Sequence, residues 1–298
     1  MSVGLIEMGS IEIVATSNKR ADTLLRDAFS GPGKRLIKRL FDQQLVHSNG
    51  QTLKKGDVVN KGTIVTIQTF SELSEVFTPV PEALPLTKVH ETNSFLILDK
   101  PASIPSMPLS PGEKGTLANR LVHFYPTLKG IGMDPREAGL VNRLDAGTSG
   151  LLLVAKNQDS WRSLRSLFKN HLVKKQYIAI CESRPIAKTN ESPLSQAKGK
   201  SFQHPSGQRA STTIVDCVPH GRYWKTTCST TTGRMHQIRV HLADLSAPLV
   251  GDVLYGGKAN DFISRHALHA SRITFPLETD QFTATSKMPL DMSELRNA

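Results

Sequence analysis

The sequence predicts an α+β protein in two parts, and three observations support this prediction. Segments typical of strands and segments typical of helices both occur in the long C-terminal part of the chain. A proline-rich stretch separates that part from a short basic beginning, and 298 residues are enough for two domains. We expect an N-terminal domain over residues 1–75, a linker over 76–88 and a larger domain over 89–298.

The N-terminal part predicts a basic helix followed by a small sheet. Residues 19–61 contain ten Lys or Arg and four Asp, a net charge of +6. Apolar residues at helical spacing form one stripe of the helix: Leu36, Ile37, Leu40 and Phe41. Basic residues occupy its other side: Lys34, Arg35, Lys38 and Arg39. Asn49-Gly50 predicts a tight turn between short strands. This arrangement would suit a phosphate backbone; a solvated charged face is the alternative.

The stretch that joins the two parts carries three prolines within residues 70–88: Pro79, Pro81 and Pro85. Proline has no N–H to donate and blocks regular hydrogen bonding. We therefore predict an extended linker here.

The C-terminal part predicts five strands, one long helix and one surface loop. The strand-like segments are rich in β-branched or aromatic residues and cover residues 94–100, 150–156, 176–182, 211–218 and 222–232. Residues 160–173 predict a helix whose apolar side holds Trp161, Leu164, Leu167, Phe168 and Leu172. The polar residues 184–211 predict a long surface loop or insertion.

Charge and cysteine content narrow the class of protein. Thirty-seven Lys and Arg against 26 Asp and Glu give a formal charge of +11, so a polyanion is a reasonable partner. The three cysteines, Cys181, Cys217 and Cys228, have no CxxC spacing and favour a reducing compartment over a disulfide framework. We find no signal peptide and no apolar run long enough to cross a bilayer. The expectation is a cytoplasmic protein without a membrane partner.

The C-terminal histidines are the first candidates for a metal site. His236, His241, His266 and His269 cluster in the sequence, but no nearby acidic or Cys residue completes a zinc ligand set. We therefore expect these side chains to pack and form hydrogen bonds, and we predict no metal. A zinc hydrolase would be the alternative, and it would require metal-dependent activity.

Two charged residues interrupt an otherwise apolar stretch, GLVNRLDAGTSGLLLVAKN, at residues 139–157. Arg143 and Asp145 lie between runs typical of buried strand. A partly buried aspartate stays ionised only beside an opposite charge or several donors. Arg239 has the matching problem, because it adjoins the apolar stripe of a second predicted helix. That stripe consists of Met235, Ile238, Leu242 and Leu245, with Pro248 ending the helix. The economical prediction is that Asp145 pairs with Arg239; a turn aspartate and a surface arginine remain the alternative.

Several of these stretches together resemble the RluA-type pseudouridine synthases. LVNRLDAGTSGLLLVAK is similar to the family signature HRLDxxTSGLLLxAK, and GRMHQIRVHLADLSAPLVGDVLYG to GRTHQIRxHLxxxGxPIxGDxxYG. Three shorter stretches follow the family order: ETNSFLILDKPASIP, VKKQYIAI and HALHASRITF. The resemblance covers roughly residues 88–276. RADTLL, KRLIKRLF, VHSNG and KKGDVV in the N-terminal part resemble an S4-type RNA-binding domain.

The resemblance implies an enzyme that converts uridine in RNA to pseudouridine. The implied fold has a central mixed, largely antiparallel sheet with flanking helices, beside a small S4-like α+β domain. The implied catalytic residues are Asp145, Tyr177 and Arg239. A carboxylate can act as nucleophile or base without a cofactor, so none is expected. Arg143 would fill or brace the gap left by the extruded base, and Ile238 would pack beneath the site.

Further expectations concern substrate contacts and partners. We predict that Arg234 and His236 contact the substrate, together with Lys34, Arg35, Lys38 and Arg39 of the N-terminal helix. The partner implied by the S4-like domain is ribosomal RNA of the large subunit, bound by a monomer. Four positions depart from the family pattern: Asn142 for His, Met235 for Thr, Ser103 for Gly, and Ala146 for a larger polar residue. None of them removes Asp145, Tyr177 or Arg239, so we predict an active enzyme; a non-catalytic RNA-binding or ribosome-assembly factor and a synthase acting on tRNA are the alternatives.

Overall fold

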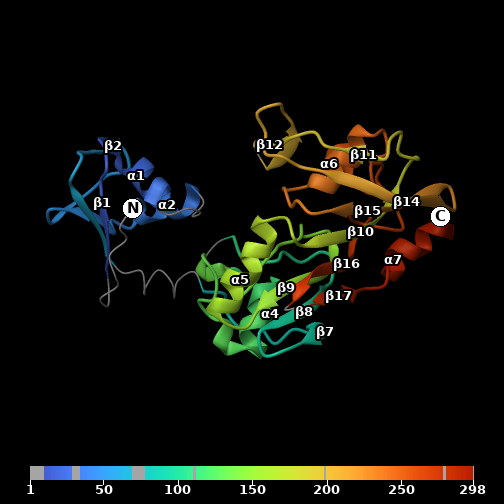
Figure 1. The fold of residues 1–298 in the computed structure, drawn as a ribbon, viewed down its shortest axis with the longest axis horizontal. Coiled ribbons are helices and arrows are strands. Elements are labelled where there is room, and N and C mark those ends of the chain that lie inside the picture. Colours follow the sequence, from blue (N-terminus) through green and yellow to red (C-terminus); the bar gives the residue numbers. More distant parts are fainter. Residues whose placement is uncertain are drawn as a thin grey trace. The chain divides into compact units, whose positions relative to one another are not determined.

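The computed structural model describes residues 10–28, 34–68, 78–109, 112–197, 199–277 and 280–297. The chain forms two compact units, and the main break between them follows Thr78. Figure 1 shows the ribbon of each unit. No helix in these ranges is both long enough and apolar enough to cross a membrane.

The N-terminal unit packs two helices against a small antiparallel sheet. Its elements are β1 (Ser10–Val14), β2 (Lys19–Arg20), α1 (Ala21–Ala28), α2 (Lys34–Asp42), β3 (Val46–Ser48), β4 (Gln51–Thr52), β5 (Val58–Val59) and β6 (Ile64–Gln68). The main sheet has the order β1-β6-β3-β4, and β2 pairs with β5. Buried residues from both helices and from β3 and β6 form its core. The predicted α+β composition of this part is confirmed.

Two local predictions for this unit can be compared with the structure. Asn49 and Gly50 take φ values of 50° and 76° between β3 and β4, as a type I′ hairpin turn requires. On α2, Ile37, Leu40 and Phe41 are buried, which confirms the predicted apolar stripe at these positions. The side chains of Lys34, Arg35 and Leu36 lie outside the described residues.

The C-terminal unit is built on one large sheet. The strands of this unit are β7 (Thr87–Glu91), β8 (Phe95–Lys100), β9 (Ser149–Ala155), β10 (Lys174–Cys181), β11 (Thr189–Asn190), β12 (Leu194–Ala197), β13 (Lys200–Gln203), β14 (Thr212–His220), β15 (Tyr223–Thr230), β16 (Leu268–Leu277) and β17 (Asp280–Thr285). Of these, β12 and β13 form a separate two-stranded sheet. Its helices are α4 (Leu117–Phe124), α5 (Gln158–Lys169), α6 (Gln237–Asp244) and α7 (Leu290–Ser293). Short 3-10 turns cover Pro126–Leu128, Pro135–Glu137, Val253–Tyr255 and Glu294–Asn297.

The sheet runs in the order β11-β14-β15-β10-β16-β9-β8-β7, with β17 beside β16. Only β16 and β9 pair in parallel among its described strand pairs. This confirms the expected mixed, largely antiparallel sheet, and each of the five predicted strands is present. All seven residues of β9 are buried, which explains its continuous apolar sequence. Helix α5 packs against β9, and α6 packs against β14 (Figure 1).

Three sequence predictions in this unit were wrong in part. Helix α5 ends at Lys169, so Leu172 lies beyond it and is exposed. Helix α6 begins at Gln237 and ends at Asp244, which leaves Met235 before it and Pro248 well after it. The predicted loop 184–211 contains β11, β12 and β13, whose backbone groups pair although most of the segment's side chains are polar.

The described part of the proline-rich segment, residues 78–88, packs on the C-terminal unit. Proline lacks a donor, yet its neighbours' carbonyls and its own still accept hydrogen bonds. Asn119 Nδ2 donates to the Val80 carbonyl, and Arg120 Nη1 donates to the Pro85 carbonyl. Strand β7 then starts at Thr87, inside the predicted linker. The compact C-terminal unit therefore begins near Pro79, ahead of the expected start at residue 89.

Candidate active site

Asp145 lies in a short loop between two segments that are held together by β-type hydrogen bonds. The chain before the loop runs against β9, with Val141 N–H donating to the Leu153 carbonyl. Thr148 N–H donates to the Asp145 carbonyl and closes the turn. The Asp145 side chain is 26% exposed, so its carboxylate is partly accessible to solvent although the neighbouring strand is buried. This placement explains why charged residues interrupt the apolar stretch.

A buried lysine fastens this loop to the segment after β8. Lys100 Nζ donates to the carbonyls of Pro101, Ile104 and Ala146 at 2.9, 2.9 and 3.1 Å. Burial, followed by the charge of Arg265, lowers the pKa of Lys100 to about 7. The three carbonyl acceptors favour the ammonium, because only that form has three N–H donors. We did not predict this role from the sequence, although a lysine directly after five largely apolar strand residues was a usable signal.

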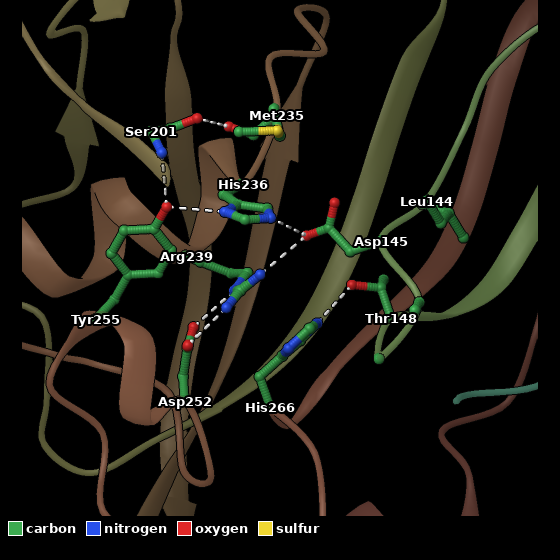
Figure 2. A network of polar contacts seen from close by, with 12 residues as sticks. Leu144, Asp145, Thr148, Ser201, Met235, His236, Arg239, Asp252, Tyr255 and His266 are labelled. Atoms are coloured by element: carbon green, nitrogen blue, oxygen red, sulfur yellow. Dashed lines mark hydrogen bonds and ion pairs between the residues drawn. The ribbon is translucent and has the colours of Figure 1, made fainter. Parts of the chain in front are cut away.

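The predicted pairing of Asp145 with Arg239 is confirmed. Arg239 Nη1 lies 3.3 Å from Asp145 Oδ2 (Figure 2). The other edge of the guanidinium binds Asp252 through two hydrogen bonds of 2.7 Å, from Nε and Nη2. Burial alone would lower the pKa of Arg239, but the hydrogen bonds and charge of Asp252, with a contribution from Asp145, raise it. Arg239 therefore carries a fixed positive charge beside Asp145.

Asp252 and Tyr255 are functional-site residues that the sequence reasoning missed. Asp252 is buried and holds Arg239 in a bidentate arrangement, which fixes the plane of the guanidinium. The Arg239 guanidinium also lies 5.0 Å from the centre of the Tyr255 ring, at cation–π distance. Both residues belong to the GDVLYG stretch, so the motif was visible but its contact with Arg239 was not.

A cavity of about 560 Å³ opens in front of Asp145. Its lining includes the predicted residues Arg143, Asp145, Tyr177, Arg234, His236, Ile238 and Arg239. Tyr177 comes from β10 and Ile238 from α6, and both are buried. Burial, followed by the charge of Asp145, raises the pKa of Tyr177 far above its usual range, so its hydroxyl keeps its proton. The volume is in the range of pockets that bind small ligands or a single nucleotide unit.

Asn142 and Arg143 directly precede the aspartate loop and differ in environment. Asn142 is buried, and its Oδ1 accepts the Leu153 N–H at 3.0 Å. It therefore ties the chain to β9, which is a structural task that an acceptor can perform without any reactive group. Arg143 is exposed at the cavity lining, with Nη1 3.9 Å from Met107 Sδ.

The remaining predicted contacts are divided between the two units. Arg234 is half-buried, and its Nε donates to the Arg209 carbonyl. Lys38 and Arg39 lie on α2 of the N-terminal unit, where Lys38 is exposed and pairs with Asp42 at 3.7 Å. Two basic cavity residues were missed by the sequence reasoning. Arg165 Nη1 donates to the Val141 carbonyl, and Lys175 Nζ donates to the Thr232 carbonyl.

The C-terminal histidines form hydrogen bonds with neighbouring hydroxyl groups. His266 Nε2 lies 2.8 Å from Thr148 Oγ1, and His241 Nδ1 lies 2.9 Å from Thr212 Oγ1. His269 Nδ1 lies 2.9 Å from Ser149 Oγ. Within the described ranges, no three His, Cys, Asp or Glu side chains are grouped so that they could hold a metal ion.

Comparisons with known proteins point to one family. Residues 94–244 match the family described as RNA pseudouridylate synthase. The chain is 32% identical to Ribosomal large subunit pseudouridine synthase D of Yersinia pestis, over 94% of this chain and 90% of that protein. It is 31% identical to Uncharacterized RNA pseudouridine synthase YhcT of Bacillus subtilis (strain 168), over 88% of this chain and 87% of the relative.

A solved structure supports the fold. Human RNA Pseudouridylate Synthase Domain Containing 4 superposes with a TM-score of 0.55 at 22% identity, over 70% of this chain and 92% of that one. The two long sequence motifs, the largely antiparallel sheet and the similarity over nearly the whole chain lead to one assignment. The chain belongs to the RNA pseudouridine synthase family, and within it to the RluA-type enzymes.

Proposed function

We propose that this enzyme isomerises specific uridines in large-subunit (23S) ribosomal RNA, with Asp145 as its catalytic group. The observation that carries the proposal is the position of Asp145 in the cavity, beside an arginine whose charge is fixed by a second, buried carboxylate. An ionised carboxylate in such a place can act as a nucleophile or a base.

The reaction moves the bond to the ribose from N1 to C5 of the uracil. The N1–C1′ bond breaks, the base turns within the cavity, and a C5–C1′ bond forms. The hydrogen on C5 leaves as a proton, and N1 ends with a proton, so no atom or electron is gained from outside. Asp145 would attack the sugar or the base, or would remove the C2′ proton. Each route needs a carboxylate within reach of the glycosidic bond and its neighbouring atoms, and none needs a metal or redox cofactor.

The neighbouring residues have distinct tasks in this proposal. Arg239 keeps a positive charge beside Asp145 and pairs with its carboxylate. The Tyr177 ring stacks on the target base, and its protonated hydroxyl assists proton transfer at C5. Ile238 forms an apolar surface beneath the base.

The target base must leave its stack before it can enter the cavity. A stacked uridine hides its glycosidic bond, and extrusion costs about a few kcal/mol. Arg143 fills or braces the gap left by the base, a role supported by its exposure at the cavity lining beside the aspartate. Arg234 and His236, which also line the cavity, contact the extruded nucleotide.

Ribosomal RNA is proposed because of charge and relatives. The chain has a formal charge of +11, and the N-terminal residues 19–61 contribute +6 of it. We propose that residues 1–75 are an S4-like RNA-binding domain, with Lys34, Arg35, Lys38 and Arg39 on its phosphate-binding helix. The relatives named Ribosomal large subunit pseudouridine synthase D support the choice of substrate. The enzyme would work as a cytoplasmic monomer.

The proposal is tested by mapping pseudouridine in total RNA from cells with and without the gene. One or more sites in 23S RNA should disappear in the deletion strain and return with the wild-type gene, but not with Asp145→Asn. A lost site in tRNA would change the substrate. If no site is lost and the purified protein modifies neither RNA, the non-catalytic RNA-binding alternative replaces this proposal.

A further inference from the structure

His236 lies between Tyr255 and Asp145 and connects them (Figure 2). Its Nδ1 is 2.8 Å from the Tyr255 hydroxyl, and its Nε2 is 3.9 Å from Asp145 Oδ2. The isomerisation as described above gives this ring no task beyond a general contact. Its surroundings, however, are specific enough to assign it one.

The hydrogen-bond chain favours one position for the imidazole proton of His236. Ser201 N–H donates to the Tyr255 hydroxyl oxygen at 2.9 Å, and a backbone amide can only donate. The Tyr255 O–H is then available to donate to His236 Nδ1, which leaves the ring proton on Nε2. The opposite tautomer would turn an Nε2 lone pair toward the Asp145 carboxylate, which is electrostatically unfavourable. His236 thus presents an N–H toward Asp145.

The charge states agree with this assignment. Burial lowers the pKa of His236; the Asp145 charge opposes this and the Arg239 charge adds to it, so the ring is neutral at neutral pH. Burial also raises the pKa of Tyr255, which keeps its hydroxyl proton. Tyr255 and His236 therefore form a neutral donor chain that ends beside the Asp145 carboxylate.

The backbone holds His236 in place at a conformational cost. Its φ is 55°, in the left-handed region that residues other than glycine rarely adopt. The Ser201 hydroxyl donates to the carbonyl of the preceding residue, Met235, at 2.6 Å. Val240 N–H donates to the His236 carbonyl at 3.0 Å. Ser201, on the β12–β13 hairpin, therefore supports both the backbone and the ring partner of His236.

The distance between His236 and Asp145 suggests what binds there. At 3.9 Å the two groups are too far apart for a direct hydrogen bond. One oxygen atom can, however, lie within hydrogen-bond distance of both. A hydroxyl would satisfy both groups at once, because it accepts from Nε2–H and donates to the carboxylate.

On the proposed function, that hydroxyl is part of the ribose. Every route for Asp145 at the sugar brings it close to C1′ or C2′, and the 2′-hydroxyl is attached to C2′. We propose that His236 Nε2–H and Asp145 Oδ2 together bind the 2′-hydroxyl of the target nucleotide, with Tyr255 and Ser201 as positioning residues. The inference rests on the proposed function and adds a group that distinguishes RNA from DNA at the modified position.

The test uses product RNA, which carries the 2′-hydroxyl and no longer reacts. A short RNA is made around the uridine found by mapping, with pseudouridine or 2′-deoxypseudouridine at that position. Fluorescence anisotropy gives Kd for both RNAs with wild-type protein, His236→Phe and His123→Phe. His123 is exposed on α4 outside the cavity lining, so its variant is a matched control.

Wild type and His123→Phe should prefer the hydroxyl-bearing RNA by at least about 10-fold, and His236→Phe should reduce that ratio by about 5-fold. An unchanged ratio of the two Kd values in His236→Phe overturns the inference, whether or not the affinity for both RNAs falls. The proposed function survives that result if the wild-type protein still isomerises the matching uridine RNA. Failure of that isomerisation overturns both.

A second measurement tests the tautomer of His236 in the wild-type protein. Nitrogen-15 NMR of the wild-type protein reports which ring nitrogen of His236 carries the proton. At neutral pH, Nδ1 should be unprotonated and Nε2 protonated. Tyr255→Phe should lower the population of this tautomer or reverse the preference. A wild-type ring protonated on Nδ1 would remove the donor and overturn the inference.

Discussion

Replacing Asp252 with asparagine separates the support of Arg239 from the chemistry of Asp145. The Asp252 side chain is 1% exposed and accepts two 2.7 Å hydrogen bonds from Arg239. Asparagine keeps the size and one acceptor oxygen. It removes the charge and turns an N–H₂ group toward one of the arginine N–H groups.

The expected loss of stability follows from the burial of the pair. Removing one partner of a buried ion pair costs about 3–5 kcal/mol, because the other charge is left uncompensated. Here Asp145 remains as a second counter-charge at 3.3 Å, and the amide oxygen of the introduced asparagine still accepts one hydrogen bond. We therefore expect the free energy of unfolding to fall by about 3 kcal/mol, at the lower end of that range.

The effect on catalysis follows from the orientation of the guanidinium. With Asp252 in place, the Nε and Nη2 edge is occupied and only Nη1 faces Asp145. Without it the guanidinium is free to turn, and a displacement near 1 Å at a reacting group costs roughly 100-fold in rate. We expect the single-turnover rate to fall by about that factor, with a small change in RNA affinity.

Urea unfolding followed by circular dichroism gives the stability, and single-turnover kinetics on the mapped RNA give the rate. Asp216→Asn, an exposed aspartate on β14, is the matched control and should change neither quantity. The double variant Arg239→Met with Asp252→Leu should regain stability without regaining activity. The reasoning is refuted if Asp252→Asn stays within about 0.5 kcal/mol of wild type, the range of ordinary surface substitutions, and keeps its rate.

Three further predictions address other parts of the chain. Lys100→Met removes the donor to three carbonyls and should lower the free energy of unfolding by about 3 kcal/mol in urea titrations; a loss no greater than that of an exposed lysine would argue against the anchor. Burial, followed by the charge of Arg239, lowers the pKa of His266 to about 3, so between pH 6.5 and 3 the unfolded chain binds a proton that the folded protein does not. The free energy of unfolding should therefore decrease as the pH is lowered from 6.5 to 3. His266→Gln should make this pH dependence less steep, and an equal pH dependence in wild type and variant would contradict the assignment. Deleting residues 1–75 should weaken RNA binding and flatten its salt dependence, since phosphate contacts determine that slope, and an unchanged slope would exclude the basic helix as an RNA contact.

The pairing at the centre of the site could be predicted from the sequence for a physical reason. Asp145 and Arg239 each presented a charge next to apolar residues, and desolvation made an ion pair the economical solution. Asp252 could not be placed in the same way. It lies in a loop rich in glycine, where an aspartate has many possible uses, and its contact with Arg239 depends on how the chain folds back after α6.

The errors have similar causes. The period of α6 appeared to include Met235, but His236 takes a left-handed conformation and the helix begins at Gln237, two residues after Met235. The β12–β13 hairpin was hidden because its side chains are polar, although its backbone pairs regularly. Asn142 illustrated the limit of motif comparison. Its departure from the family pattern gave a reason to doubt activity, whereas the structure gives its amide a backbone partner, the N–H of Leu153.

The most direct test of the central claim measures how much hydrogen the purified protein releases from C5 of uridine. Ribosomal RNA labelled with tritium at C5 of uridine is incubated with wild-type enzyme and with Asp145→Asn, and tritium released to water is counted. The account predicts that the wild-type protein releases tritium in proportion to the pseudouridine formed. Asp145→Asn, which is expected to fold and bind the RNA, should release none above background. Release by the variant at a rate near that of wild type would contradict the assignment of Asp145 as the catalytic residue.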